Sequence, residues 1–410
     1  MTSYIRLSRR GWVLAMNACI WYLIARVNHN LIALLLAWGS LAILGVSFIA
    51  AFGSLRRIRF RRAATPDAQV GKLTSLPIVC MNLKRRRRQP FILEEPLAFT
   101  DQGVCCTAVP PLPVNGDLLL ERTIMPVRRG EYRLDQLVAR DSDPAGLFLR
   151  ERQISLPSSI VVYPATLPIR QLRLPPQETF NVSTAVTPIS ASGNSHEFYG
   201  VREYHPSDGM RHIHWRSSAR CGRLMVREFE RSAALSVALL LDADADALTP
   251  KTGANLETCV TLAASICRHL EGIYCTIGLA AGGAQAIAHQ PQDAQLAMSR
   301  LSYELATIAP GKVSLAAAAE DVVAALPPHG IVFCFTLSDT PHLRDFLDTL
   351  VVRGLDVRWY LATAEAFSTV SGGRRGKSRR QPETPATITG AGLLPVVLTP
   401  EMSTDEIFEG

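Results

Sequence analysis

Residues 197–231 hold the densest mixture of arginine, histidine, acidic and aromatic residues in the chain. Arginine side chains stack on aromatic rings and hold carboxylates through two hydrogen bonds, so this mixture predicts a partly buried network of ion pairs. The turn residues at 206–209 predict a cap for a short helix that reaches Trp215, but the alternation of Ile213 and Trp215 with polar residues also fits a strand over His212–Arg216. The candidate interaction residues are Glu197, Phe198, Arg202, Tyr204, Asp208, Arg211, Trp215 and Arg220.

Four acidic residues form a second candidate site, for a divalent cation. Asp242, Asp244 and Asp246 follow one apolar run, and Asp339 follows another. If both runs are parallel strands of one sheet, their carboxyl ends meet at the same edge and bring these acids together. Mg²⁺ and Ca²⁺ prefer such oxygen ligands. The alternative, which we favour, is that the acids cap the loops after the strands, so we expect no cofactor and at most a weakly held Mg²⁺ or Ca²⁺ ion.

Other kinds of reactive site find little support in the sequence. The histidines at 196, 205, 212 and 214 lie among arginines, which repel cations, and no acid completes a zinc pattern with them. The nine cysteines are odd in number and include no C-x2-C pair, which favours small buried side chains in a reducing compartment. The sequence contains no P-loop, no G-x-S-x-G elbow and no dinucleotide-binding glycine motif after a strand.

The elements that must position both sites alternate between strands and helices. Apolar runs predict strands over 235–242, 274–280, 331–337 and 356–361, and helical periodicity predicts helices over 256–270, 294–308, 315–326 and 341–353. Residues 392–398 and 403–408 predict a last strand and a last short helix, after an insert over 372–386 that is rich in glycine and basic residues. This alternation predicts a doubly wound α/β domain with a parallel sheet covered on both faces.

The region before residue 175 has a different pattern. Short apolar stretches at 73–83, 91–99, 116–122, 130–138 and 159–163 are separated by proline and glycine, which predicts a β-sandwich-like domain. The basic run Lys84–Arg88 lies between two of these strands. It fits contact with anionic lipid headgroups if a membrane anchor lies nearby, and it fits a solvated hairpin loop equally well.

Two apolar runs near the N-terminus, Trp12–Val27 and Leu31–Gly53, are separated only by a short polar break. The second run would span about 35 Å as a helix, which is enough to cross a bilayer. Arginines precede and follow the pair, so the positive-inside rule predicts a two-span hairpin in the cytoplasmic (inner) membrane, with the bulk of the chain in the cytoplasm. A twin-arginine export signal is the alternative, but the second apolar run and the missing small-residue cleavage site favour the anchor.

These patterns divide the 410 residues into four parts. We predict a membrane hairpin over 1–62, a β-rich domain over 63–175, the signature segment over 176–234, and the α/β domain over 235–410. The formal net charge is +7, and much of the excess lies beside the apolar runs. The charge therefore indicates membrane lipid rather than nucleic acid as a partner.

The order of residues in the signature segment resembles that of a bacterial membrane-protein family known as domain of unknown function 58. The matching pattern is EF-x3-R-x-Y-x2-GD-x2-R-x-I-x-W-x3-AR, in which Ser207 replaces the usual glycine and His214 stands where aspartate is usual. A second shared element is Asp143-Pro144-Ala145-Gly146-Leu147-Phe148, in which Ala145 replaces an aromatic residue. The α/β domain also resembles von Willebrand factor A-type domains, whose metal site uses Asp-x-Ser-x-Ser with a distant threonine and aspartate.

The von Willebrand resemblance assigns Asp242 and Asp339 to metal ligands, whereas Asp244 and Asp246 replace the two serine hydroxyls. The threonine position falls near Val313 or Ser314. The family resemblance implies a membrane-anchored cytoplasmic scaffold or adaptor, not an enzyme, whose partner is a MoxR-type AAA+ ATPase in protein maturation or envelope processes. The alternative is a metal-dependent hydrolase or ligand-binding protein that uses the four acids.

Overall fold

A computed structural model of the chain divides into two compact units. The first comprises Met1–Thr166 and Arg300–Ile308, and the second comprises Leu167–Ser299 and Ala309–Gly410. The structure describes residues 3–53, 55, 57–64, 67–170, 172–174, 198–204, 213–229, 235–250, 252–273, 275–368 and 393–408.

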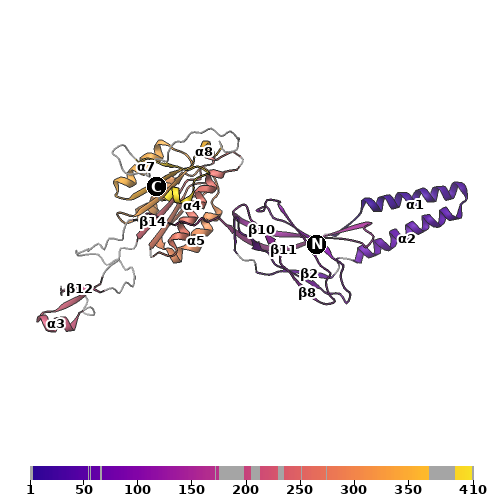
Figure 1. Ribbon diagram of the computed structural model, residues 1–410, viewed down its shortest axis with the longest axis horizontal. Helices are drawn as coiled ribbons and strands as arrows, with labels where there is room; N and C mark the ends of the chain where they lie inside the picture. The colour runs from indigo at the N-terminus through magenta and orange to yellow at the C-terminus, as the bar shows by residue number, and fades with distance from the viewer. Residues whose placement is uncertain are drawn as a thin grey trace. The chain divides into compact units, whose positions relative to one another are not determined.

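The predicted N-terminal hairpin is present as two helices that lie side by side, α1 (Arg9–Asn28) and α2 (Leu31–Gly53) (Figure 1). Ser8 caps α1 by accepting a hydrogen bond from the Gly11 N–H, and His29 ends it in the left-handed conformation. Within the described residues, one helix has the length and composition to cross a membrane, over Leu31–Phe52. Composition therefore supports the predicted membrane span for α2 and not for α1.

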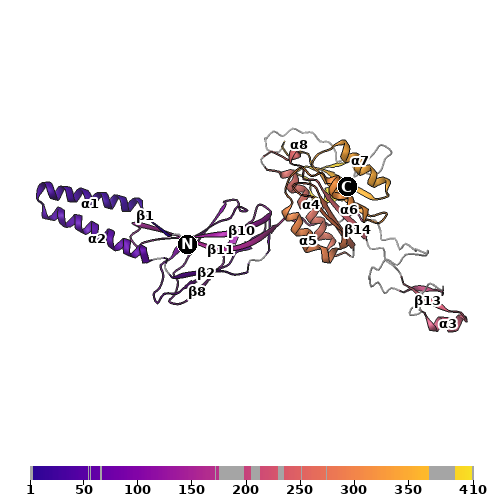
Figure 2. The same ribbon diagram turned by 180° about the vertical axis from the view of Figure 1, so that it is seen from behind.

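The middle region is rich in sheet, as predicted, and its strands form three sheets (Figure 2). The largest sheet has the order β1-β11-β10-β6-β7, with β3 paired to β11; the others are β2-β5-β8 and β4-β9. The strands are β1 (Ser3–Leu7), β2 (Ile58–Arg62), β3 (Ala68–Gln69), β4 (Thr74–Ser75), β5 (Ile78–Asn82), β6 (Phe91–Pro96), β7 (Val104–Val109), β8 (Asp117–Leu120), β9 (Thr123–Ile124), β10 (Gly130–Ser142) and β11 (Phe148–Tyr163). Sequence patterns missed β1, β2, β3, β7 and β9, and they predicted only the end of β11.

Strands β1 and β2 tie both ends of the helical hairpin to the same β-rich unit. The strand before α1, β1, pairs with β11 in the largest sheet. The strand after α2, β2, pairs with β5 in a second sheet. Ile58 of β2, Ile78 of β5, Leu93 of β6 and Leu137 of β10 belong to one buried cluster, so the two sheets share a core.

The turn between β10 and β11 is the Asp143–Phe148 motif, and it holds the start of α1. Buried Asp143 accepts hydrogen bonds from the N–H groups of Ala145 (3.0 Å) and Phe148 (2.6 Å), which fixes the turn. Ser8 then donates its N–H to the Leu147 carbonyl and its hydroxyl to the Gly146 carbonyl, at 2.8 and 2.7 Å. The motif therefore fixes the N-cap residue of α1 to the β10–β11 turn.

Two arginines of β11 bind backbone carbonyls at the other end of the hairpin. The Arg150 guanidinium donates to the carbonyls of Ala51 (3.2 Å) and Phe52. The Arg152 guanidinium donates to the carbonyls of Leu55 (2.8 Å) and Ile58 (3.0 Å). Cations at a helix C-terminus satisfy its free carbonyls and favour its dipole. The end of α2 is thus fixed to the β-rich unit.

A buried ion-pair network lies in the same unit. Glu95 of β6 is fully buried and pairs with Arg62 (2.5 Å) and Arg122 (2.6 Å). Arg122 also donates from Nε to the Leu76 carbonyl at 3.2 Å. This network therefore buries two positive charges and one negative charge, on residues that lie far apart in the sequence.

The C-terminal α/β region contains the predicted parallel strands within a six-stranded sheet of the order β16-β15-β14-β17-β18-β19. The order reverses at β14, which is the arrangement of a doubly wound sheet. Edge strand β16 is antiparallel to β15. It was not predicted, because its sequence is polar and contains a proline, which is rare in strands other than edge strands. The strands are β14 (Leu235–Leu241), β15 (Cys275–Ala281), β16 (Ile287–Asp293), β17 (Ile331–Thr336), β18 (Asp356–Leu361) and β19 (Val396–Val397).

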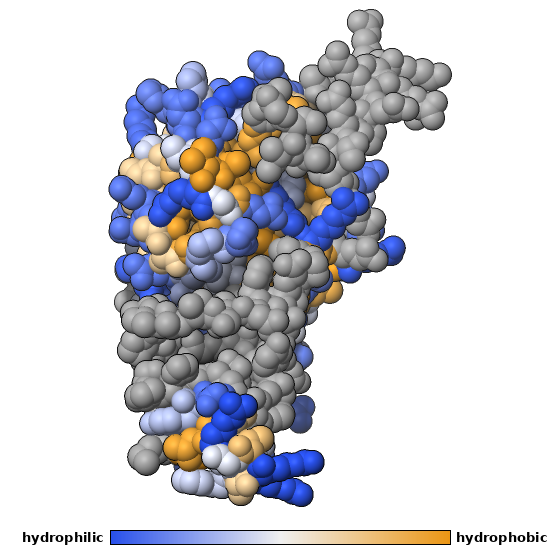
Figure 3. Space-filling view, turned by 90° about the vertical axis from the view of Figure 1, so that its left-hand side faces the viewer, coloured by the Kyte–Doolittle hydropathy of each residue, from blue (hydrophilic) through white to orange (hydrophobic). Residues whose placement is uncertain are grey.

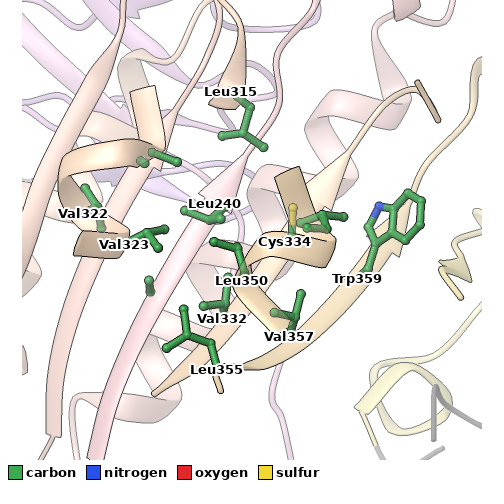
Figure 4. Packing of buried hydrophobic residues seen from close by; sticks show 14 of the residues in the cluster. Leu240, Leu315, Val322, Val323, Val332, Cys334, Leu350, Leu355, Val357 and Trp359 are labelled. Atoms are coloured by element: carbon green, nitrogen blue, oxygen red, sulfur yellow. The ribbon is translucent and has the colours of Figure 1, made fainter. Parts of the chain in front are cut away.

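The helices of this region are α4 (Ala254–Leu270), α5 (Ala294–Thr307), α6 (Leu315–Ala324), α7 (Pro341–Val352), α8 (Ala364–Ser368) and α9 (Thr404–Phe408). All lie close to their predicted bounds except α8, which was not predicted. On one face of the sheet, Val322 and Val323 of α6 and Leu350 of α7 pack against Leu240 and Val332 (Figure 4). The predicted insert over 372–386 lies outside the described residues.

Candidate functional site

The signature segment forms a small lobe of its own, made of β12 (Phe198–Glu203), α3 (Trp215–Cys221) and β13 (Met225–Phe229). Strands β12 and β13 are antiparallel, with Arg202 opposite Val226 and Glu203 opposite Met225. Helix α3 begins at Trp215, later than the predicted helix, and ends before Gly222, which is left-handed with φ of 67°. Trp215 and Arg216 are therefore helical and not part of a strand, whereas the predicted cap at 206–209 lies outside the described residues. We name this lobe, residues 198–229, the signature lobe.

His214 is the N-cap of α3. Its side chain accepts a hydrogen bond from the Ser217 N–H at 3.3 Å, and its ring nitrogen lies 2.7 Å from the Ser217 hydroxyl. Aspartate is a preferred N-cap residue, so the aspartate usual here in the resembling family fits the same role. The replacement therefore keeps a helix cap.

Ser218 links α3 to β13 and was missed by sequence reasoning, because a serine inside a helix carries no distinctive signal. Its hydroxyl donates to the His214 carbonyl at 3.0 Å and accepts from the Met225 N–H at 2.8 Å. The His214 N–H donates to the Met225 carbonyl at 2.8 Å. These bonds hold the start of α3 against the strand that follows it.

The outer surface of the signature lobe combines aromatic, apolar and basic side chains. Trp215 is 67% exposed and Leu224 is 43% exposed. Arg216 and Arg220 are exposed on the same helix. In the space-filling view, this lobe lies at the bottom and shows apolar atoms beside strongly hydrophilic ones (Figure 3). The predicted partial burial is wrong for Trp215, Arg216 and Arg220.

The remaining signature residues are placed only in part. Tyr204 is half-buried and donates its backbone N–H to the Leu224 carbonyl at 2.9 Å. Phe198 and Arg202 lie on β12. Glu197, Asp208 and Arg211 lie outside the described residues, as do the side chains of Phe198 and Arg202. Their predicted interaction role stays a prediction.

The second candidate site lies at the carboxyl edge of the α/β sheet, where β14 and β17 are neighbours as expected. Asp242 follows β14 and is 8% exposed. Its backbone N–H donates to the Phe335 carbonyl at 2.8 Å, and its carboxylate accepts a long bond, 3.5 Å, from the Leu337 N–H. The Asp242 side chain therefore accepts the backbone N–H of the residue that follows β17.

The side chains of Asp244 and Asp339 have partners of their own, and Asp246 is exposed. Asp244 caps a 3₁₀ turn over Ala245–Ala247 by accepting from the Asp246 N–H at 3.1 Å. Asp339 receives two hydrogen bonds from Arg344, one of them 2.6 Å long, and this pair lowers the pKa of the Asp339 carboxyl. Among the described residues, no three His, Cys, Asp or Glu side chains are grouped so as to hold a metal ion. Asp244 therefore has the capping role that the sequence analysis favoured. Asp339 instead forms an ion pair with Arg344 that the sequence did not predict.

Asn255, which the sequence did not single out, connects several elements at this edge through four side-chain hydrogen bonds. Its side chain accepts from the N–H groups of Thr249 and Leu256, both at 3.0 Å. It donates to the carbonyls of Ala247 (2.9 Å) and Ala362 (3.2 Å). Asn255 is fully buried, so it joins the acidic loop, the start of α4 and the end of β18.

Asp242→Asn is expected to stabilise the chain at neutral pH. Burial raises the pKa of the Asp242 carboxyl above its ordinary value, against the lowering effect of the Leu337 N–H. A raised folded-state pKa gives stability that is fully present below the unfolded pKa of about 3.9 and is lost as pH rises through the folded pKa. Thermal unfolding at several pH values should therefore show a gain towards acid that the variant lacks.

Asp246→Asn is the matched control for this experiment, because Asp246 is exposed. It should leave both the melting temperature and its pH dependence unchanged. A lower melting temperature for Asp242→Asn at neutral pH would show that the Asp242 charge is stabilising, contrary to this expectation.

Comparison with known proteins agrees with the resemblance of the signature segment. Residues 200–354 match the family described as "Protein of unknown function DUF58". The uncharacterized protein YeaD of Bacillus subtilis (strain 168) is 28% identical over 123 residues, which is 28% of this chain and 29% of that protein. The chain thus spans less than a third of the length of this curated relative.

The similar solved structures give no guide to fold or function. A β-glucosidase from Listeria innocua matches with a TM-score of 0.17 and 9% identity, over 26% of this chain and 16% of its own. The alkylpurine DNA glycosylase AlkC of Pseudomonas fluorescens matches with a TM-score of 0.19 and 11% identity, over 38% of this chain and 44% of its own. Both scores are too low to carry an argument.

Proposed function

We propose that this chain is a membrane-anchored adaptor that recruits a protein partner through the exposed surface of its signature lobe. The observation that carries the proposal is Trp215, which is 67% exposed at the first position of α3 with Arg216 and Arg220 exposed on the same helix. Tryptophan and arginine are the residue types most enriched among side chains that dominate binding energy at protein interfaces.

The anchor is the helical hairpin. Helix α2 is apolar enough to cross a bilayer, and large apolar side chains of both helices face outward, such as Trp12 (62% exposed) on α1 and Ile49 (72% exposed) on α2. Both ends of the hairpin are fixed to one β-rich unit. A segment that leaves and re-enters one folded unit crosses a bilayer an even number of times, so we propose that α1 returns alongside α2, with Arg26 extending to the headgroups.

With both ends on one side, we propose that the β-rich and α/β regions lie in the cytoplasm at the inner membrane, because the residues that flank the hairpin are basic. The α/β region is proposed to be von Willebrand factor A-like. Its strand order, with the reversal at β14, supports this assignment without a metal site. The family resemblance makes a MoxR-type AAA+ ATPase the first partner to test.

Trp215→Ala is expected to weaken the affinity of the full chain, purified in detergent, for a purified MoxR-type AAA+ ATPase by about thirtyfold, the effect of losing an interface hot spot. Binding to the immobilised ATPase measures this change. The variant should keep the wild-type melting temperature, because an exposed side chain contributes little to stability.

Leu296→Ala is the control, since Leu296 is 80% exposed on α5, outside the signature lobe. Its affinity should equal that of the wild type. Equal weakening by both substitutions, unchanged affinity of Trp215→Ala, or no binding by the wild type would each contradict the proposed partner surface.

A further inference from the structure

We propose that the β5–β6 loop forms a binding surface for the headgroups of anionic phospholipids, and this inference rests on the proposed membrane anchor. The surface consists of Leu83, Arg85, Arg86 and Arg87, together with Arg57 and Val114. All six residues are exposed. We name it the headgroup surface.

The headgroup surface lies at the end of α2, the helix that can cross a bilayer. The Leu83 N–H donates to the Arg57 carbonyl at 3.0 Å, and Arg57 follows the last residue of α2, Gly53, by only a few positions. In the sheet register, Asn82 at the end of β5 lies opposite Ile58 at the start of β2. The loop therefore begins at the level where the chain leaves the hairpin.

Arg88 closes the loop on the same side. It is 8% exposed, and this burial is the largest cause of its lowered pKa. The charge of nearby Asp141 raises the pKa of Arg88, and the charge of nearby Arg150 lowers it further. Arg150 is the residue that binds the carbonyls of Ala51 and Phe52 at the end of α2. Both ends of the loop thus lie beside the base of the hairpin.

The loop is held in shape by buried Asn82, which is 1% exposed. Its side-chain amide donates to the carbonyls of Arg86 (3.0 Å) and Pro113 (2.7 Å), and its oxygen accepts from the Lys84 N–H at 3.1 Å. The Asn115 N–H donates to the Lys84 carbonyl at 3.3 Å, which brings Val114 beside the loop. Three consecutive arginines are therefore presented on a fixed backbone instead of a free coil.

The side chains of the headgroup surface match the chemistry of a bilayer interface. Leu83 is 44% exposed and Val114 is 46% exposed, so two apolar groups flank the arginines. Apolar side chains enter the acyl boundary, while arginine donates paired hydrogen bonds to phosphate oxygens. Four arginines beside a membrane helix attract anionic lipid, because each basic residue near such a surface contributes about 1 kcal/mol, or roughly a fivefold preference.

The test uses the full chain in bilayer nanodiscs of phosphatidylcholine mixed equally with phosphatidylglycerol. Spin-labelled lipids report how strongly the protein prefers phosphatidylglycerol over phosphatidylcholine. We expect the triple variant R85Q/R86Q/R87Q to lower this preference by at least about fivefold, and high salt to reduce the wild-type preference by screening.

A charge-matched control comes from the opposite end of the β-rich unit. Arg128 and Arg133 lie at the start of β10, whose 13 residues end at the turn that holds α1, roughly 30–40 Å away. Lys72 lies beside them, because the neighbouring Gly71 N–H donates to the Pro126 carbonyl at 2.9 Å. The variant K72Q/R128Q/R133Q removes the same charge and should keep the wild-type preference.

Two results would overturn the headgroup surface while leaving the anchor intact: equal preference in all three proteins, or protection of the loop amides from hydrogen exchange by inorganic phosphate alone in detergent. The second result would assign the loop to small anions. Failure of the wild-type chain to enter nanodiscs would instead refute the membrane anchor itself. Wild-type melting temperatures of both triple variants in detergent would show that they are folded.

Discussion

Glu95→Gln is expected to lower the free energy of unfolding of the full chain by about 3–5 kcal/mol, the usual cost of removing one partner from a buried ion pair. Glu95 is the only acid that contacts Arg62 and Arg122 within the described ion pairs, and the three side chains are almost completely buried. The substitution keeps the shape but leaves two guanidinium groups without a counter-charge. Chemical unfolding of the chain in detergent measures the change.

Glu94→Gln is the matched control, because it changes the neighbouring residue in the same way. Glu94 pairs with Arg140, whose side chain is 48% exposed, and such surface pairs contribute about 0–1 kcal/mol. A second variant that replaces Glu95, Arg62 and Arg122 together with methionine should recover much of the lost stability, because no charge then stays buried. Similar losses for Glu94→Gln and Glu95→Gln would show that the buried network contributes no more than a surface pair.

Asn255→Ala is expected to cost about 3 kcal/mol or more, because several backbone groups at this edge lose a side-chain partner at once. Each unsatisfied buried donor or acceptor costs about 1–3 kcal/mol. The Thr249 N–H and the Ala247 and Ala362 carbonyls are the groups affected most, since they lie outside the helix that Asn255 begins. Thermal unfolding of the full chain measures the loss.

Thr258→Ala on the same helix provides the comparison. The Thr258 hydroxyl donates only within α4, to the Ala254 carbonyl at 2.9 Å, so its removal should cost less than about 1 kcal/mol. If Asn255→Ala cost no more than Thr258→Ala, the acidic loop would be held by its backbone bonds alone.

The sequence predicts the fold well where the signal is local. The apolar runs that become β14, β17 and β18 and the periodic segments that become α4 and α7 were found within a few residues. Prediction failed for β7, whose Val-Cys-Cys-Thr-Ala-Val sequence has no polar alternation, and for β1, whose arginine looks like a membrane flank. In both, strand formation depends on a partner strand that is distant in sequence.

The candidate site was less predictable, because its side chains are committed to partners that spacing does not reveal. Asp339 pairs with Arg344 across the start of α7, which removes it from the predicted acidic cluster. Asn255 reaches Ala362, more than a hundred residues away. Trp215 is exposed although its apolar ring suggested burial. Long-range hydrogen bonds and side-chain exposure depend on the folded structure, so no local sequence pattern predicts them.

The pairing of β1 with β11 also sets an order of events during synthesis. Residues Ser3–Leu7 leave the ribosome before their partners, residues 148–152, which follow about 140 positions later. At ~5–20 residues per second this delay is about seven to thirty seconds. During that time the apolar helix emerges and β1 waits as an unpaired edge, the kind of segment that invites wrong pairing. The largest sheet of the β-rich unit can therefore be completed only after both helices of the hairpin have been synthesised.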